Sequence, residues 1–302
     1  MPELPEITVY VERLQALARG QSLQALRLGS PFILRTVEPR PETFLGRALE
    51  SVGRIGKRIV MEFGGEHYAV IHLMIAGRLV WRPPAAALPR RVGLAAFDFP
   101  AGSLLLTEAG SKHRASLHLV SGAAGLASFD RGGVDVLQVS PEVFAAALRR
   151  QSRTLKRALT DPTIVDGIGN AYSDEILHRA RLSPFVLTCT LDDGAISKLH
   201  RAAAQVLREW IARLREETGS GFPERVTPFR KEMAVHGKFG QACPVCGAPV
   251  QRVVYAENEA NYCPGCQTGG RILADRSLSR LLKDDWPRTL EELEKLRPRS
   301  RD

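Results

Sequence analysis

The sequence predicts an α+β chain of more than one domain, and three observations support this. Short segments of alternating apolar and polar residues occupy the first 130 residues, a helical pattern runs from residue 140 to about 217, and four of the five cysteines lie in the last quarter. At 302 residues the chain also exceeds the size at which a single core usually stops growing, about 250–300 residues. We therefore expect an antiparallel β domain, a helical domain and a small cysteine module, in that order.

The first expected element is an amphipathic helix that begins near Pro5. Its apolar residues recur at helical spacing, and they are Ile7, Val11, Leu14 and Ala18. Gly20 ends the pattern, and Pro5 suits the first helical position. Glu3 and Glu6 then lie near the positive end of the helix dipole, which is an ordinary structural reason for an acidic helix start.

Short strands joined by tight turns follow this helix. The strands that the alternation predicts are residues 54–63, 67–75, 93–99, 103–110 and 114–120. Gly64-Gly65 joins the first two as a hairpin, and Pro100-Ala101-Gly102 joins the next two. We expect these strands to form an antiparallel β layer with the first helix packed against it.

A helical region begins where Ser140 is a good N-cap and Pro141 occupies the first helical position. Its last helix carries an apolar stripe made of Ile196, Leu199, Ala203, Val206, Trp210 and Leu214. Between the earlier helices lies the glycine-containing turn "DPTIVDGIGNAYSDEIL", residues 161–177. Residues 217–228, "ETGSGFPERVTP", have the composition of a linker.

The charge of the chain favours a polyanionic partner. The formal net charge is +9 and the sequence pI is about 9.6, which is typical of nucleic-acid binding domains. The alternative is charge that serves solubility alone. No apolar run approaches the ~18 residues of a membrane span and no signal peptide is evident, so we expect a soluble cytoplasmic protein with no membrane partner.

The cysteine module has the spacing of a zinc ribbon. Cys243 and Cys246 form one CxxC pair, Cys263 and Cys266 form another, and 16 residues separate the pairs. Four thiolates leave no open position on the metal, so we expect one structural zinc per chain and chemistry elsewhere. Removal of the metal is expected to unfold the module. Cys189 remains, and we expect it to be a buried thiol.

Four motifs, taken in order, resemble one enzyme family. They are "PELPE" at residues 2–6, "RIGKRIV" at 54–60, "GIGNAYSDEIL" at 167–177 and "CPVCG…YCPGCQ" at 243–267. Together they resemble the formamidopyrimidine-DNA glycosylase/endonuclease VIII family of base-excision repair enzymes, from residue 2 to about residue 268.

The resemblance implies a domain plan. The expected domains are a catalytic N-terminal β-sandwich with a leading helix (1–130), a helix-two-turns-helix DNA-binding domain (140–218), a zinc ribbon (236–270) and an additional tail (271–302). For the tail we expect packing rather than DNA contact.

The resemblance also implies covalent chemistry at the amino terminus. After removal of the initiator Met, Pro2 attacks C1′ of the damaged nucleotide and forms an iminium ion, and elimination of the flanking phosphates follows. An α-amino group with a pKa of about 8 is partly neutral at pH 7, whereas an ordinary lysine is almost fully protonated. Glu3 matches the acid/base carboxylate and Glu6 a second family glutamate. Lys57 matches the β-hairpin lysine that contacts phosphate; its alternative is a solvated strand lysine.

The resemblance places DNA contacts at several positions. Asn170 matches the asparagine of the helix-two-turns-helix motif, where turn amides at a helix N-terminus hold phosphates. Lys156 matches a phosphate or base contact, and Glu175 a position near the damaged-base pocket. Asn258 stands where the family has a phosphate-gripping arginine, and it brings no charge.

The residues that fill the space of a flipped nucleotide differ from the family pattern. The family carries His-Leu-x-Met after the second hairpin, whereas "HLMIAG" here puts Ile75 at the methionine position and Met74 one residue earlier, on the opposite face of a strand. We expect Ile75 to be the apolar wedge. The loop "TEAGSKHRASL" replaces a second family motif, and Lys112 and Arg114 are candidates to contact the opposite strand, with a solvated basic loop as the alternative.

The leading hypothesis is a monomeric DNA glycosylase with abasic-site lyase activity on double-stranded DNA with damaged, chiefly oxidised, bases; in a bacterium it is nucleoid-associated. A non-catalytic damaged-DNA-binding protein is one alternative, because the wedge and Asn258 are altered. A lyase with little base-excision activity is another. A zinc-ribbon transcription or translation factor explains the charge but leaves "PELPE" unexplained.

Overall fold

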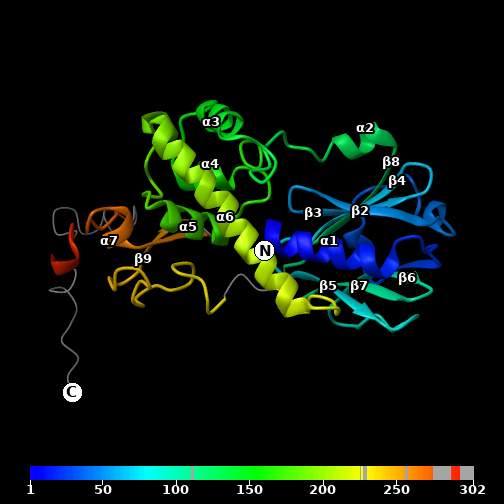
Figure 1. The fold of residues 1–302 in the computed structure, drawn as a ribbon. Coiled ribbons are helices and arrows are strands. Elements are labelled where there is room, and N and C mark those ends of the chain that lie inside the picture. The colour runs from blue at the N-terminus through cyan, green and yellow to red at the C-terminus, as the bar shows by residue number, and fades with distance from the viewer. Residues whose placement is uncertain (110–111, 225, 227–229, 256–257, 275–286, 293–302) are drawn as a thin grey trace, which may run out of the picture. The chain divides into compact units, whose positions relative to one another are not determined.

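The computed structural model describes residues 1–109, 112–224, 226, 230–255, 258–274 and 287–292. The chain divides into two compact units: unit 1 holds residues 1–132 and 207–228, and unit 2 holds residues 133–206 and 229–302 (Figure 1). Helix α6 (Asp193–Thr218) contributes its first half to unit 2 and its second half to unit 1. Among the described residues, no helix has the length and apolar content that crossing a membrane requires.

Besides the second half of α6, the described part of unit 1 contains two helices, two 3-10 turns and eight strands. They are α1 (Leu4–Ala18), β1 (Ala25–Leu28), η1 (Pro31–Ile33), η2 (Pro41–Phe44), β2 (Leu49–Ile55), β3 (Arg58–Phe63), β4 (His67–His72), β5 (Gly77–Arg82), β6 (Gly93–Phe99), β7 (Gly102–Glu108), β8 (Ser116–Ser121) and α2 (Gly122–Ala127). One sheet has the order β1-β6-β7-β5 and the other β2-β3-β4-β8, with all neighbours antiparallel. Two four-stranded antiparallel sheets around one core form a β-sandwich, as predicted.

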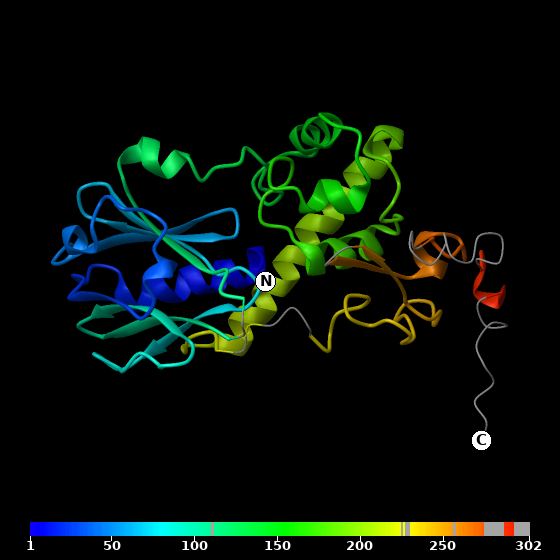
Figure 2. The same cartoon turned by 180° about the vertical axis from the view of Figure 1, so that it is seen from behind.

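Helix α1 lies between the levels of the two sheets in both views (Figures 1 and 2). Its residues Ile7, Tyr10, Leu14 and Ala18 are fully buried and belong to the same core cluster as both sheets. The helix begins at Leu4, so Pro5 takes its second position rather than the first, because Glu3 serves as the N-cap.

The two predicted hairpins are present, with one correction. Residues 54–63 do not form one strand, because β2 ends at Ile55 and β3 begins at Arg58. Gly56 and Lys57 form a two-residue turn between them, and Gly56 adopts φ +62°, a conformation that glycine adopts without a steric penalty. The sequence pattern predicted one strand containing Ile55 and Ile59, whereas Gly56-Lys57 separates them into two paired strands.

Unit 2 contains the predicted helices and the ribbon. Its elements are α3 (Pro141–Arg149), α4 (Leu155–Thr160), α5 (Asn170–Ala180), η3 (Thr188–Thr190), the first half of α6, β9 (Gln251–Tyr255), β10 (Asn258–Tyr262) and α7 (Pro264–Gln267). Ser140 caps α3, with its hydroxyl accepting a hydrogen bond from the Val143 N–H. The predicted apolar stripe of α6 is buried along its length, and Phe144 of α3 packs against His200 of α6 with ring centroids 5.3 Å apart.

The segment after the ribbon turns back on it. The Ile272 N–H donates to the Arg288 carbonyl at 2.8 Å, and Arg271 pairs with Thr289. The Leu273 N–H donates to the Tyr262 hydroxyl at 2.8 Å. These contacts agree with packing of the tail, whose residues 275–286 and 293–302 lie outside the described part of the chain. Cys189, predicted to be buried, is exposed beside Ser152 at the start of η3.

Candidate active site and zinc site

The amino-terminal end of α1 is held by two glutamates. The Glu6 carboxylate accepts a hydrogen bond from the Glu3 backbone N–H at 2.9 Å, and the Glu3 carboxylate caps the Glu6 N–H in return. Both side chains are almost fully buried, at 3% and 4% exposure. This capping box satisfies free N–H groups and places negative charge at the positive end of the helix dipole. The same contacts fix both carboxylates next to buried Pro2.

The α-amino group of the chain lies among four charged side chains. Burial lowers the pKa of the Met1 α-amino group, and the cations of Arg78 and Lys57 lower it further, against the opposing effects of Glu3 and Glu6. The net effect is a lowered pKa, so a larger fraction of this amine is neutral than of an ordinary α-amino group. The sequence pointed to Glu3, Glu6 and Lys57 but not to Arg78, because Arg78 comes from β5, which the alternation did not predict.

Lys57 lies in the turn between β2 and β3 and is half-buried, so it is not the solvated strand lysine of the alternative interpretation. A lysine in a two-residue turn projects from the end of the hairpin rather than from a sheet face. Its charge acts on the α-amino group.

Ile75 lies in a tight turn between β4 and β5. The turn is closed by the Gly77 N–H, which donates to the Leu73 carbonyl at 2.9 Å, and by the Arg78 guanidinium, which donates to the Ile75 carbonyl at 3.0 Å. A Cβ on Gly77 would lie 2.2 Å from the Leu73 oxygen, so only glycine fits there. Ile75 is 59% exposed, a high value for an isoleucine.

Contrary to the prediction from the sequence, Ile75 and Met74 do not lie on opposite faces of a strand, because β4 ends at His72 and both residues belong to the turn before β5. Met74 adopts φ +51°, an unusual conformation for a residue with a side chain. The conformation of the turn therefore sets the directions of these two side chains, and the alternation of side chains along a strand does not apply to them.

The loop between β7 and β8 carries Lys112 and Arg114, and both are exposed. Its base is fixed by Glu108, which is 1% exposed and accepts hydrogen bonds from the Arg114 N–H at 3.0 Å and from the Ala115 N–H. Glu108 thus organises the backbone of the loop, a role that the sequence did not reveal.

Lys156 is a buried residue of α4 and reaches α5 with its side chain. Its ammonium is 1% exposed and donates to the Asp174 carboxylate and to the Asn170 backbone carbonyl, both at 2.6 Å. The other oxygen of Asp174 lies 2.8 Å from the His236 ring and 3.3 Å from the Asn261 amide nitrogen. Lys156 therefore ties α4 to the first turn of α5. Its predicted contact with DNA stays a prediction.

Asn170 is the first residue of α5, after Gly169 at the N-cap, and Gly167 adopts φ +77° in the preceding turn. The N–H groups at a helix start can hold a phosphate. In the same helix, Glu175 accepts hydrogen bonds from the backbone N–H groups of residues 234, 235 and 236 at 2.8–2.9 Å. Burial raises the pKa of Glu175 against the effect of these donors. Asn258 begins β10 opposite Tyr255.

The four ribbon cysteines converge as the spacing predicts. The sulfurs of Cys246 and Cys263 are 3.3 Å apart and those of Cys243 and Cys266 are 3.9 Å apart. Bonds of 2.3 Å to a tetrahedral zinc ion place sulfurs about 3.8 Å apart, so the residues fit the metal. The Val245 N–H and the Cys266 N–H approach the Cys243 and Cys263 sulfurs, which stabilises thiolates.

Further features of the ribbon fit one closed zinc site. A Cβ on Gly265 would lie 3.0 Å from the Cys246 sulfur, so this position leaves room for the sulfurs. Burial raises the pKa of the Cys266 thiol to about 11, so a cation is needed to hold it as a thiolate at neutral pH. Four thiolates leave no open position on the ion, and its role is structural.

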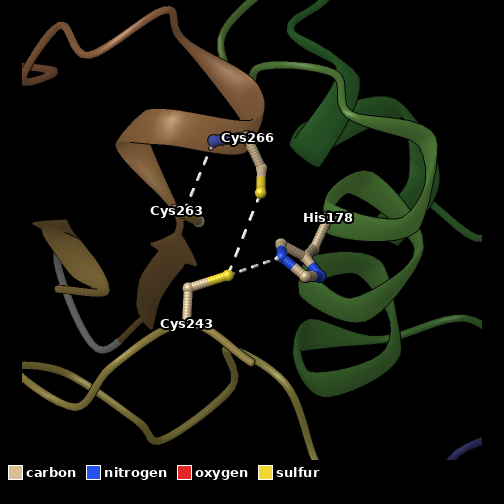
Figure 3. Close-up of side chains that lie close together, drawn as sticks. All are labelled: His178, Cys243, Cys263 and Cys266. Atoms are coloured by element: carbon tan, nitrogen blue, oxygen red, sulfur yellow. Dashed lines mark hydrogen bonds between the residues drawn. The ribbon is translucent and has the colours of Figure 1, made fainter. Parts of the chain in front are cut away.

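One residue that the sequence did not indicate joins this cluster. His178, on α5, points at Cys243, and its Nε2 lies 3.3 Å from the Cys243 sulfur (Figure 3). The ligand atoms of His178, Cys243, Cys263 and Cys266 all lie within 4.8 Å of one another. His178 is 65 residues from Cys243 along the chain, so no local spacing could reveal it.

Comparison with known protein families matches three consecutive parts of the chain. Residues 1–109 match the formamidopyrimidine-DNA glycosylase N-terminal domain, and residues 135–220 match the H2TH domain of the same enzymes. Residues 240–269 match a zinc finger found in FPG and IleRS.

Several curated proteins are similar over most of the chain. A formamidopyrimidine-DNA glycosylase of Chloroflexus aurantiacus is 30% identical over 278 residues, which cover 88% of this chain and 98% of that protein. One of Mycolicibacterium gilvum is 30% identical over 287 residues, 90% of this chain and all of that protein. An uncharacterized formamidopyrimidine-DNA glycosylase-like protein of Mycobacterium tuberculosis is 43% identical over 151 residues, half of this chain and 94% of that protein.

Solved structures are also similar to this chain over most of its length. The complex of a Lactococcus lactis FPG mutant with DNA containing Fapy-dG matches with a TM-score of 0.77 and 25% identity, over 88% of this chain and all of that one. The complex of Lactococcus lactis Fpg with DNA containing an abasic site also has a TM-score of 0.77 at 25% identity, over 88% of this chain and 99% of that one.

Proposed function

Because the chain belongs to the formamidopyrimidine-DNA glycosylase family, we propose that it excises damaged bases from double-stranded DNA and cuts the abasic site through the amine of Pro2. The proposal rests on the burial of the amino terminus and on the charged residues that surround it. Burial, Arg78 and Lys57 favour a neutral amine there, and Glu3 and Glu6 are held beside it. A neutral amine is the nucleophilic form.

Removal of Met1, which the small neighbour Pro2 permits, brings the secondary amine into these surroundings. The Pro2 nitrogen then bonds to C1′ as the bond from C1′ to the base breaks, the proton of the amine passes to the departing base, and Glu3 supplies a proton to the opening sugar. Loss of the amine proton and ring opening give an iminium ion. The iminium accepts the electrons released when C2′ loses a proton, and the 3′ phosphate leaves, followed by the 5′ phosphate. Lys57 holds phosphate and assists proton transfer.

The DNA contacts follow from the same family membership. We assign phosphate binding to Asn170 with the N–H groups at the start of α5, and to Lys57. Ile75 fills the space of the flipped nucleotide, because it is an exposed apolar side chain held in a rigid turn. Lys112 and Arg114 contact the opposite DNA strand. Asn258 binds phosphate in the ribbon more weakly than an arginine would, because its side chain is uncharged. Lys156 acts through Asn170 and Asp174.

The test is incision and borohydride trapping with three duplexes: undamaged, abasic and oxidised-base DNA. The Met-processed protein should cut the last two and become covalently trapped on both, whereas Pro2→Gly should trap at least tenfold less. A matched control carries one Glu inserted between Met1 and Pro2, which keeps the amine blocked while leaving every side chain in place.

The outcomes separate the alternatives. Binding without incision of either damaged duplex would identify a non-catalytic DNA-binding protein. Incision of abasic DNA alone would identify a lyase with little base-excision activity. Trapping that persists in both the Pro2→Gly variant and the variant with the inserted Glu would indicate that a lysine is the nucleophile, and would refute the role of Pro2.

We also propose that the enzyme acts as a monomer in the compartment that holds the DNA, the cytoplasm and nucleoid of a bacterium. One flipped nucleotide needs one amine and one wedge, and unit 1 supplies both Pro2 and Ile75. Light scattering of the protein bound to a short lesion duplex should give one chain per duplex. A mass corresponding to two chains would contradict the proposal.

A further inference from the structure

We propose that His178 is a reserve zinc ligand that replaces Cys246, so that the ribbon can hold its ion with either of two ligand sets. Three sulfurs, those of Cys243, Cys263 and Cys266, belong to both sets. The fourth ligand is Cys246 in one set and the His178 imidazole in the other. This inference concerns the metal site and does not depend on the proposed activity.

The first support is the geometry of the cluster. A zinc ion with a 2.3 Å bond to sulfur and a bond of about 2.0 Å to nitrogen places these two atoms about 3.5 Å apart. The observed separation of His178 Nε2 and Cys243 Sγ is 3.3 Å. Moreover, the ligand atoms of His178, Cys243, Cys263 and Cys266 all lie within 4.8 Å of one another. His178 is therefore close to all three shared sulfurs, as a ligand of a common ion has to be (Figure 3).

The second support is the difference in exposure. Cys246 is exposed, whereas Cys243 and Cys263 are 3% and 0% exposed and His178 is 6% exposed. An alkylating or oxidising reagent in solvent thus reaches Cys246 before the other ligands. Loss of that one sulfur leaves the buried sulfurs of Cys243 and Cys263, the partly buried sulfur of Cys266 and the buried imidazole of His178 at the site.

The third support is the element that carries His178. It belongs to α5, whose first residue is Asn170 and whose Glu175 holds the backbone of residues 234–236. A metal bond from His178 would fasten this helix to the ribbon directly. The start of α5, with its phosphate-binding N–H groups, would then keep its support when Cys246 is lost.

A simpler role for His178 is a hydrogen bond from its N–H to the Cys243 thiolate. Glutamine separates the two roles, because its amide nitrogen can donate that hydrogen bond from nearly the same place and cannot serve as a zinc ligand. The decisive comparison is therefore between Cys246→Ser and Cys246→Ser combined with His178→Gln.

The test measures zinc per chain after dialysis against a chelator of graded strength. We expect Cys246→Ser and His178→Gln singly to keep one zinc, with affinities within about tenfold of the wild type. The double variant should bind zinc at least about 10–100-fold more weakly than the wild type, which is the loss that removal of an outer-sphere partner of a metal ligand causes. Cys243→Ser, which removes a shared ligand, should lose zinc in either background. Equal zinc affinities of Cys246→Ser and the double variant would overturn the proposal.

A second measurement does not depend on the folding of the double variant. Cys246→Ser with ¹¹³Cd in place of zinc and ¹⁵N-labelled histidine should show a coupling between cadmium and one histidine nitrogen. The wild-type protein, with four thiolates, should show none. Absence of that coupling in Cys246→Ser, or loss of the metal from this single variant, would refute His178 as a ligand.

Discussion

The surroundings of one amine decide the chemistry at the residue scale. The α-amino group at Met1 has a lowered pKa because it is buried and lies near Arg78 and Lys57. In the proposed function, removal of Met1 makes the Pro2 nitrogen the terminal amine, one residue further along the chain. The two glutamates of the capping box act in the opposite direction, so the residual pKa reflects a balance that single substitutions can shift.

That balance predicts the pH dependence of trapping. The neutral amine attacks, so the rate of trapping rises with pH through the amine pKa, and its midpoint should lie below about 8. Arg78→Met removes a cation that lowers the pKa, so the midpoint should move to higher pH. Glu6→Gln removes an anion that raises the pKa, so the midpoint should move to lower pH. Single-turnover trapping between pH 5 and 9 measures both, and shifts in the same direction would contradict this account.

Lys156 offers a prediction of stability. Its ion pair with Asp174 is buried, with side-chain exposures of 1% and 0%. Lys156→Met leaves a buried carboxylate without its cation and should cost about 3–5 kcal/mol in the free energy of unfolding. Arg149→Met breaks the exposed pair with Asp193, whose side chains are 47% and 87% exposed, and should cost less than about 1 kcal/mol. Urea denaturation measures both; equal costs would contradict the structural role of Lys156.

At the scale of elements, the turn between β4 and β5 presents Ile75. Gly77 and Arg78 hold this turn, and an exposed isoleucine at its apex suits insertion between bases. The proposed wedge therefore depends on the conformation of this turn.

Ile75→Ala should separate base excision from strand cutting. Excision from an oxidised-base duplex should fall about tenfold or more, because the flipped state loses its wedge, whereas incision of an abasic site should fall less. Val37→Ala, at another exposed apolar position of unit 1, is the matched control and should change neither rate. A uniform loss on both substrates would mean that Ile75 only supports the turn.

The sequence revealed those elements whose signals are local. Caps, glycine turns and alternation located α1, α3, α6 and the β3–β4 and β6–β7 hairpins. It did not predict β5, most of β2, the four-residue strand β1 or the turn at Gly56-Lys57 that separates β2 from β3. It could not reveal the buried pairing of Lys156 with Asp174 or the approach of His178 to Cys243, because these contacts join distant residues through the packing of α5.

At the scale of the whole molecule, the zinc ribbon contacts α5 and the segment that follows it in the helical part. Removal of zinc by a chelator should unfold residues 236–270, because metal binding there supplies folding free energy. Hydrogen exchange should show lost protection in β9 and β10 and retained protection in β3 and β6, and affinity for lesion DNA should fall. Unchanged protection of the ribbon without zinc would contradict the structural role of the metal.

The most direct test of the central claim is mass spectrometry of the borohydride-trapped complex after digestion of protein and DNA. The account predicts that the sugar remnant is attached to the nitrogen of Pro2 in the amino-terminal peptide, in protein that has lost Met1. A remnant on a lysine, such as Lys57, or a trapped chain that still carries Met1, would contradict it.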